Sequence, residues 1–361
     1  MDTGSNSCMI QRDVDMSDSN TLRLTSNAAA KITIQSIDDL QTAFTFHRKE
    51  NISLRPLGDG SNVILGSFIN ACILDIAIKG IEIVNEDHDN IWVKVGAGEN
   101  WHEWVEYTLT NNWFGLENLA LIPGRVGASP IQNIGAYGVE VATFIDSVQF
   151  IDLKPGIDHL ESLQNYNNEQ CQFSYRNSIF KEKNNHRLIM SVTFRLNKSF
   201  TAQLSYPALS QAIDKLQLSR PQAIDIFSSV VNLRNSKLPD PYEIPNAGSF
   251  FKNIEVDSST LDRLLVKHSS MPYFKLMSVA EKRLFKIPSA WLIEHCGFKG
   301  KREGYLAMHS KQALVLTNLA KHKDGEKTSA EDVLKFSAYI IQSVYQEFGL
   351  SLEIEPQQIN D

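Results

Sequence analysis

The sequence is poor in cysteine and lacks the spacings that bind metals. Its cysteines are far apart and form no CxxC pair, so we expect isolated reduced thiols and neither a disulfide framework nor a cysteine-ligated zinc site. The nine histidines show no HExxH or similar spacing, and we therefore expect no structural metal. The cysteines are Cys8, Cys72, Cys171 and Cys296.

Positive charge and long apolar runs are also scarce. The 35 Lys and Arg residues against 42 Asp and Glu give a net charge of −7, which argues against a general nucleic-acid binder. The chain has no run of 18 apolar residues, and its N-terminus lacks the basic-then-apolar order of a signal peptide. Hydrophobic residues make up 42% of the chain and charged residues 21%, as in globular proteins. These features predict a soluble cytoplasmic protein.

The 361 residues suit two or three domains, and the pattern along the chain predicts an α+β fold. Residues 1–18 are polar and aperiodic, which predicts a disordered tail. Residues 19–200 are rich in strands, with helices predicted after Ser36 and around Trp101, Trp104, Val105 and Thr108. Residues 201–361 carry more helices. The last of these is predicted to begin with a capping box from Thr328 to Glu331 and to end at Gly349, before a final strand.

Two segments are rich in glycine. The stretch "LIPGRVGASPIQNIGAYGVEV", residues 121–141, has only two charged side chains, and "LGDGSN" places Gly58 and Gly60 where tight left-handed turns are expected. No helix opens directly after either segment, unlike a Rossmann fingerprint. Glycine turns of this kind present backbone N–H groups to a phosphate without any lysine. The alternative is that they are merely tight loops.

Several motifs resemble one enzyme family. "PLGDGSNVIL", "VGAGENWHEWVEYTL" and the 121–141 stretch are similar to the FAD-binding half of the UDP-N-acetylenolpyruvoylglucosamine reductases (UDP-N-acetylmuramate dehydrogenases). "YRNSIFK", "KLPDP", "NAGSFFKN" and "WLIEHCGFKG" resemble their second half. The resemblance runs from Asn20 to Glu355. It implies a vanillyl-alcohol-oxidase/PCMH-type FAD-binding region over 19–200, followed by an α+β substrate-binding domain over 201–361, whose final strand returns to the active site.

The resemblance also implies the cofactors. FAD is expected to bind against the two glycine segments, and NADPH is expected to supply the hydride. Neither segment contains a histidine, so we expect the flavin to be bound non-covalently. Gly124, Gly127, Gly135 and Gly138 are expected to let FAD approach bare backbone. The full set of expected cofactor-binding residues is Gly58, Gly60, Ser61, Asn62, Pro123, Gly124, Gly127, Ser129, Asn133, Gly135, Tyr137 and Gly138.

The family reduces an enolpyruvyl ether to a lactyl ether in peptidoglycan biosynthesis, which implies roles for three residues. Arg176 is expected to bind the substrate carboxylate and steady the enolate, Ser249 to donate the proton, and Glu355 to act beside them. Taken without the resemblance, each has an ordinary alternative: a solvated arginine, a turn serine, and the solvent side of an edge strand.

The resemblance implies substrate contacts as well. Tyr206 is similar to the mobile-loop tyrosine that covers the substrate in one subclass, and Lys237 and Asn253 are similar to ligands of the uridine diphosphate. The chain departs from the family pattern at Gln357, where arginine is usual. This departure affects how the C-terminal residues align with the family, and we expect Glu355, and not Glu353, to be the active-site glutamate.

Two rival functions are weighed against this one. Another FAD-dependent oxidoreductase of the same superfamily, such as a 2-hydroxy-acid or alditol oxidase, would not be expected to carry both "NAGSFFKN" and "YRNS". A flavin-binding protein without catalysis is favoured only by the altered C-terminus. From the family we expect a monomer, with no nucleic-acid or membrane partner.

Overall fold

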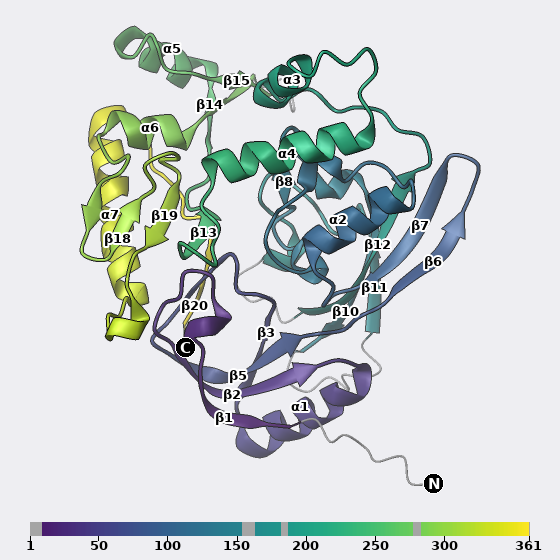
Figure 1. The fold of residues 1–361 in the computed structure, drawn as a ribbon. Coiled ribbons are helices and arrows are strands. Elements are labelled where there is room, and N and C mark those ends of the chain that lie inside the picture. Colours follow the sequence, from purple (N-terminus) through teal and green to yellow (C-terminus); the bar gives the residue numbers. More distant parts are fainter. Residues whose placement is uncertain (1–8, 154–162, 182–186, 277–282, 361) are drawn as a thin grey trace. The chain divides into compact units, whose positions relative to one another are not determined.

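The computed structural model describes residues 9–153, 163–181, 187–276 and 283–360 (Figure 1). The chain forms two compact units built from interleaved segments. The first unit comprises Met1–Val14, Ala28–Gly60 and Asn70–Ser236, and the second comprises Asp15–Asn27, Ser61–Ile69 and Lys237–Asp361. These boundaries differ from the predicted division at residues 200 and 201. The first unit continues to Ser236, and two short N-terminal segments belong with the C-terminal part of the chain.

One sheet of the first unit carries a helix on its face. Its order is β1 (Gln11–Asp15), β2 (Asn27–Ile34), β5 (Phe68–Ile76) and β3 (Ser53–Leu57), with β3 parallel to β5. Helix α1 (Ile37–Glu50) begins after Ser36 as predicted, with Asp39 completing a capping box. It packs beside β3 and buries one apolar face against the sheet (Figure 1), formed by Leu40, Ala43, Phe44 and Phe46.

The other large sheet of the first unit is antiparallel. Its order is β11 (Leu163–Asn167), β10 (Ile145–Asp152), β12 (Arg187–Asn197), β7 (Asn90–Gly96) and β6 (Ile81–Glu86). Helix α2 (Trp101–Thr110) buries the face that its spacing predicts, formed by Trp101, Trp104, Val105 and Thr108. Helices α3 (Pro207–Asp214) and α4 (Ala223–Lys237) follow, and residues of both join the same hydrophobic core.

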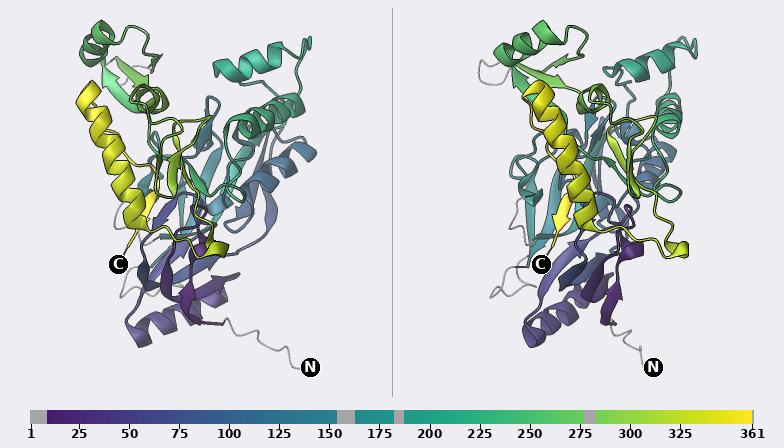
Figure 2. Two further views of the ribbon diagram at one scale, coloured as in Figure 1. Left: turned by 60° about the vertical axis from the view of Figure 1, so that its left-hand side comes forward. Right: turned by 90° about the vertical axis from the view of Figure 1, so that its left-hand side faces the viewer.

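The second unit has its own core and several small sheets. Strands β13 (Asn246–Ser249), β19 (Val315–Asn318), β18 (Leu306–Met308) and β17 (Arg302–Glu303) form one sheet, and β14 (Ile254–Asp257), β16 (Leu284–Ile287) and β15 (Phe274–Lys275) form another. Strand β20 (Gln357–Ile359) pairs in parallel with β4 (Val63–Leu65). Helices α5 (Ser258–Lys267), α6 (Ser289–His295) and α7 (Ala330–Phe348) complete the unit, with α7 beside β18 and α6 (Figure 2).

Helix α7 confirms the predicted apolar face but not the predicted cap. Its N-cap is Ser329, which forms a capping box with Asp332, one residue later than the predicted pair of Thr328 and Glu331. Backbone hydrogen bonding from Ser329 lowers the pKa of Asp332. Gly349 ends the helix at φ 66°, as predicted. The buried positions include the predicted Val333, Phe336, Ile340, Val344 and Phe348.

The predicted tail is partly ordered, so the boundary at residue 18 was wrong. Residues 11–15 form β1, and residues 17–19 form a 3₁₀ turn. Between them Met16 is fully buried, and its backbone N–H donates to the Ser26 carbonyl at 2.8 Å. Because the segment is mostly polar, nothing in the sequence indicated that Met16 would be buried. Residues 1–8, including Cys8, lie outside the described part of the chain.

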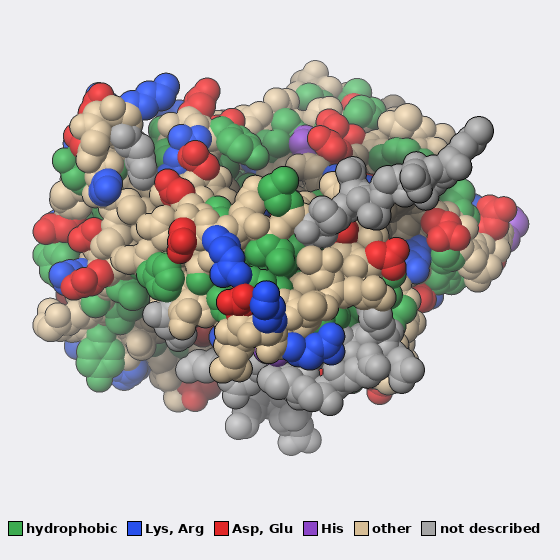
Figure 3. Space-filling view, turned by 90° about the horizontal axis from the view of Figure 1, so that it is seen from below, with side chains coloured by type: hydrophobic (Ala, Val, Ile, Leu, Met, Phe, Trp, Pro, Cys, Tyr) green, Lys and Arg blue, Asp and Glu red, His purple; other side chains and the backbone are tan. Residues whose placement is uncertain are grey.

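The described surface mixes charges of both signs. On the face drawn in Figure 3, acidic and basic side chains lie among one another and form no continuous basic patch on the atoms described there. None of the helices described is both long enough and apolar enough to span a membrane.

Candidate active site

The first glycine segment forms the turn between β3 and β4. Gly60 adopts the left-handed conformation at φ 63°, as predicted, whereas Gly58 does not. Gly58 therefore needs no special backbone freedom, and a Cβ there would meet Arg125 only at 3.8 Å. The carbonyl of Asn62 accepts a hydrogen bond from the Gln357 N–H at 3.0 Å, and Ser61 is half-buried beside it. The end of the chain thus holds this turn directly.

The second glycine segment is held against the start of α2. Its backbone pairs with residues 97–101: Gly124 accepts from the Trp101 N–H at 3.0 Å, and the Gly127 N–H donates to Ala97 at 2.9 Å. A Cβ at Gly127 would lie 2.5 Å from the Cβ of Ala97. This glycine is therefore required by close packing of the protein on itself. Pro123 lies exposed just before this pairing.

Two further glycines of this segment also face protein atoms. A Cβ at Gly135 would lie 3.1 Å from Nη1 of Arg176, and a Cβ at Gly138 would lie 2.3 Å from the Ser205 hydroxyl. Gly138 also has φ +85°, which side chains rarely adopt. The sequence-based explanation was that FAD requires these glycines. Close packing of protein atoms gives a further reason for glycine at Gly127 and Gly138.

Two polar side chains predicted to contact FAD also hold the loop together. Ser129 and Asn133 are each only 1% exposed. The Ser129 hydroxyl donates to the Val126 carbonyl at 2.7 Å. The Asn133 amide donates to Glu140 at 2.9 Å and to the Ser174 carbonyl at 3.2 Å. Asn133 Oδ1 accepts from the Ala142 N–H at 3.0 Å, so all the polar groups of this side chain have protein partners.

A pocket lies between the two glycine segments of the first unit. Its lining combines glycines and apolar side chains with two arginines as the charged groups, which suits one part of a flat, phosphate-bearing cofactor such as FAD. The lining includes Leu57, Gly58, Gly127, Ala128, Ile131, Ile189, Arg125 and Arg187.

Arg125 was missed by the sequence analysis, although it joins the two glycine segments. Its guanidinium pairs with Asp59 at 2.6 Å and with Asp75 of β5 at 2.8 Å, and it donates to the Ile76 carbonyl. Burial opposes the charge, but the two carboxylates outweigh it and raise the pKa of Arg125. Lys31 also pairs with Asp75, at 3.3 Å. No local spacing connects these positions, so only the fold reveals the network.

The predicted catalytic arginine reaches the predicted cofactor loop. Arg176 adopts a left-handed conformation at φ 53° in a tight turn, where Ser174 and Asn177 exchange backbone hydrogen bonds at 3.0 and 3.1 Å. Its Nη2 donates to the Gly135 carbonyl at 2.9 Å, and the guanidinium lies 5.2 Å from the Tyr175 ring. Arg176 is thus half-buried and positioned, not a freely solvated side chain.

Two predicted tyrosines come together near Arg234, another half-buried arginine. The rings of Tyr137 and Tyr206 meet edge to face, with centroids 5.2 Å apart, and Tyr206 is 41% exposed at the start of α3. Burial raises the pKa of Tyr137, and Arg234 of α4 acts in the opposite direction. Burial likewise lowers the pKa of Arg234. The Arg234 Nε is buried without a hydrogen-bond partner in the described part of the chain.

In the second unit, Ser249 and Glu355 lie on neighbouring chain segments. The Glu355 N–H donates to the Phe250 carbonyl at 2.9 Å, and Phe251 and Ile354 form an antiparallel bridge. Glu355 is only 7% exposed, so the alternative interpretation, in which it faces solvent from an edge strand, is wrong. The Glu353 side chain is 69% exposed and pairs with Lys252. The predicted final strand is reduced to this bridge, followed by β20.

The other two predicted substrate ligands also belong to or border the second unit. Lys237 is exposed at the end of α4. Asn253 follows the Ser249 segment and is half-buried, and its Oδ1 accepts from the Ser289 N–H at 3.1 Å at the start of α6. One face of the Asn253 amide is thus already fixed by α6.

Comparison with known proteins identifies the class and then the family. The family model described as "FAD binding domain" matches residues 28–156, so the chain is a flavoprotein with a PCMH-type FAD-binding region, as the α+β fold and the glycine loops indicate. The model of the "UDP-N-acetylenolpyruvoylglucosamine reductase, C-terminal domain" matches residues 240–359.

Relatives along nearly the full length support the same assignment. The UDP-N-acetylenolpyruvoylglucosamine reductase of Bdellovibrio bacteriovorus is 40% identical over 348 residues, covering 96% of this chain and 98% of the relative. That of Pseudoalteromonas atlantica is 42% identical over 340 residues, covering 94% of this chain and 92% of the relative. The chain therefore belongs to the UDP-N-acetylenolpyruvoylglucosamine reductase family. The solved reductase structure from Thermus caldophilus shares the fold, with a TM-score of 0.63 at 20% identity, covering 97% of this chain and 99% of that one.

Proposed function

We propose that this protein reduces UDP-N-acetylglucosamine enolpyruvate to UDP-N-acetylmuramate in peptidoglycan biosynthesis, with FAD as cofactor and NADPH as hydride donor. Family membership over nearly the whole chain supports the reaction class. The structural observation that carries the proposal is the pairing of residues 353–355 with residues 250–252, because it buries a carboxylate beside the segment of the expected proton donor.

FAD would be held by the pocket between the two glycine segments. When bound, it supplies a hydride, taken from NADPH, to the terminal vinyl carbon of the substrate. Gly60 adopts the left-handed conformation in the first segment, and glycine turns of this kind present backbone N–H groups to phosphate oxygens. Ala128 and Ile131 provide an apolar wall. Arg125 fixes both segments through Asp59 and Asp75.

The chain's own residues would handle the charge and the proton. Arg176 binds the substrate carboxylate through its guanidinium and stabilises the negative charge that spreads onto it when the hydride adds. Ser249 donates a proton to the carbon next to the carboxylate, which completes the lactyl ether. Glu355, buried beside the Ser249 segment, helps to orient this proton donor.

The nucleotide-sugar end would be bound by separate groups. Lys237 and Asn253 are proposed to contact the uridine diphosphate, and Tyr206 to cover the substrate through a small movement of its exposed ring. Arg234 is a further cation for an anionic part of the substrate, since a buried guanidinium is normally stabilised by an anion or by hydrogen bonds to all its N–H groups.

An anaerobic flavin experiment tests the reaction. Mixing the purified holoprotein with NADPH should bleach the flavin absorbance, and adding UDP-N-acetylglucosamine enolpyruvate should restore it. Recovery of the absorbance with this substrate, together with no bleaching of the oxidised holoprotein by a 2-hydroxy acid or a polyol, separates the proposed reductase from other flavin oxidoreductases. Absence of bleaching and recovery would overturn the function.

Location and assembly belong to the same proposal. A reductase that uses NADPH and a UDP-linked sugar is expected in the cytoplasm, where both are made. We also propose, from the family alone, that the protein acts as a monomer. Sedimentation at catalytic concentrations measures this directly.

A further inference from the structure

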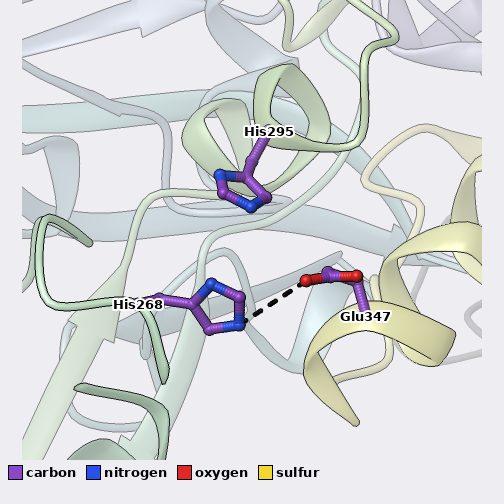
Figure 4. Close-up of side chains that lie close together, drawn as sticks. All are labelled: His268, His295 and Glu347. Atoms are coloured by element: carbon purple, nitrogen blue, oxygen red, sulfur yellow. Dashed lines mark ion pairs between the residues drawn. The ribbon is translucent and has the colours of Figure 1, made fainter. Parts of the chain in front are cut away.

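Three side chains of the second unit with metal-binding atoms converge outside the proposed active site. His268 directly follows α5, His295 is the last residue of α6, and Glu347 lies in the last turn of α7 (Figure 4). One ligand atom from each lies within 4.8 Å of the others. Nε2 of His268 and Oε1 of Glu347 are 3.8 Å apart, beyond hydrogen-bond length.

Aromatic packing restricts both imidazoles. Trp291 stacks on His295 with centroids 4.8 Å apart and planes 27° apart. Phe348 lies 4.6 Å from the His268 ring, whose side chain is only 9% exposed. The two imidazoles meet nearly at right angles, at 88° and 5.2 Å. The rings are therefore held close together before any ligand arrives, which lowers the entropy cost of bringing their nitrogens to a shared ion.

We propose that His268, His295 and Glu347 form a binding site for a divalent transition ion, of which zinc is the best match. Two imidazoles and a carboxylate suit zinc, whereas magnesium and calcium prefer oxygen ligands. Zinc–ligand bonds of about 2.0–2.1 Å at tetrahedral angles place ligand atoms roughly 3.3 Å apart. The 3.8 Å pair is close to that value, and small side-chain rotations bring in the third ligand. Water fills the fourth position.

The neighbouring thiol does not join the ligand set. Cys296 directly follows His295 in the sequence. Its Sγ is directed at the Ser343 carbonyl at 3.9 Å. The site is thus a two-histidine, one-glutamate centre. This proposal departs from the expectation of no structural metal. The three ligands come from α6, α7 and the residue after α5, which are far apart in the sequence, so no motif spacing marks them.

The consequence of binding is local stabilisation. The ion would tie the C-terminal ends of α5, α6 and α7 to one another, and any ligand that binds only the folded state raises stability. Its effect is independent of the reductase reaction, so a failure of the proposed function leaves this inference testable.

The test is zinc binding by the untagged, full-length holoprotein after removal of chelators. Equilibrium dialysis against ZnCl₂ with elemental analysis should give one tight zinc per chain, and Zn²⁺ should raise the unfolding temperature. Because loss of an outer-shell partner already weakens metal binding about 10–100-fold, H295Q and E347Q should each weaken zinc binding at least that much. Co²⁺ in place of zinc should give the strong visible absorption of a tetrahedral site, absent from both variants.

Matched controls exclude general surface binding. H88Q removes an exposed histidine of the first unit, and E331Q removes an exposed carboxylate from the same helix as Glu347. Both should bind zinc like the parent protein. H295Q and E347Q change exposed positions, so they are expected to fold even if H268Q does not. Zinc binding that is weak in the parent, or equal in the parent and in H295Q and E347Q, would overturn the proposal.

Discussion

Two glutamates near the C-terminus make different contacts, and this difference assigns them different roles. Glu355 is buried beside the Ser249 segment, whereas Glu353 points to solvent and pairs with Lys252. We expect Glu355→Gln to slow transfer from reduced flavin to the enolpyruvyl substrate by about 10²–10⁴-fold, the usual cost of disturbing proton transfer. Glu353→Gln should stay near the parent rate, because an exposed ion pair contributes little. Stopped-flow flavin absorbance measures both, and equal rates for the two variants would contradict the assignment.

Ser249 allows the two half-reactions to be separated. Ser249→Ala should leave reduction of the flavin by NADPH nearly unchanged, because the serine acts only on the second substrate. Oxidation by the enolpyruvyl substrate should fall by about 10²–10⁴-fold. Ser351→Ala, at an exposed position just before the two glutamates, is the control and should affect neither half. Slower reduction by NADPH with a normal second step would show that Ser249 has another role.

At the level of elements, Arg125 links its own loop to the turn after β3 and to β5. Its loss should therefore weaken FAD binding more than it slows catalysis by the protein that still holds FAD. Arg125→Gln leaves Asp59 without its partner and Asp75 with Lys31 alone. An unpaired, partly buried charge costs about 1–3 kcal/mol. We therefore expect roughly tenfold or greater weakening of FAD binding, measured by fluorescence of released flavin. Adding Asp59→Asn should cost less than the sum of the single changes. Additive losses would show that the ion pair is not coupled to the loops.

Strand β1 provides a second test at this scale. Deleting residues 1–18 removes the strand and the fully buried Met16, whose burial stabilises the fold by about 1.5–3 kcal/mol. We expect a clear loss in the free energy of unfolding, measured by urea denaturation. Deleting residues 1–8 removes no described contact and serves as the control. If the two deletion variants have the same free energy of unfolding, β1 and Met16 do not stabilise the fold as the structure indicates.

Elements with a strong local pattern could be predicted, and those fixed by distant partners could not. The buried face of α2 followed directly from apolar spacing. The start of α7 was misplaced because Thr328 and Ser329 are both good caps, and the fold uses Thr328 elsewhere: its hydroxyl donates to Asn318 at 2.9 Å. The glycine segments were found by composition. The network of Arg125 was not, because its carboxylate partners are far away in sequence.

At the scale of the whole molecule, the same limit applies to the division into units. A break near residue 200 follows the change from strand-rich to helix-rich sequence. The core of the second unit also contains Leu22, Leu24 and Ile64, all fully buried, from two short N-terminal segments. Neither segment has a composition that marks it as part of a distant core, so the interleaving appears only in the folded chain.

This interleaving predicts that the C-terminal fragment 201–361 cannot fold alone. It would lose the three buried N-terminal residues, at about 1.5–3 kcal/mol each, and the pairing of β4 with β20. It would also lose the hydrogen bond from Asn318 to the Leu22 carbonyl at 2.9 Å. Since folded proteins are stable by only about 5–15 kcal/mol, these losses are enough to unfold the fragment.

The fragment should therefore be insoluble or lack a cooperative unfolding transition by circular dichroism. Co-expression with residues 1–200, which carry the missing segments, should recover a soluble complex. The matched comparison is co-expression with residues 1–200 carrying Leu22→Asp and Leu24→Asp, which places charges in the core and should abolish the recovery. If the fragment alone unfolds cooperatively, or if the charged partner rescues it equally well, the N-terminal segments are not required for the second core.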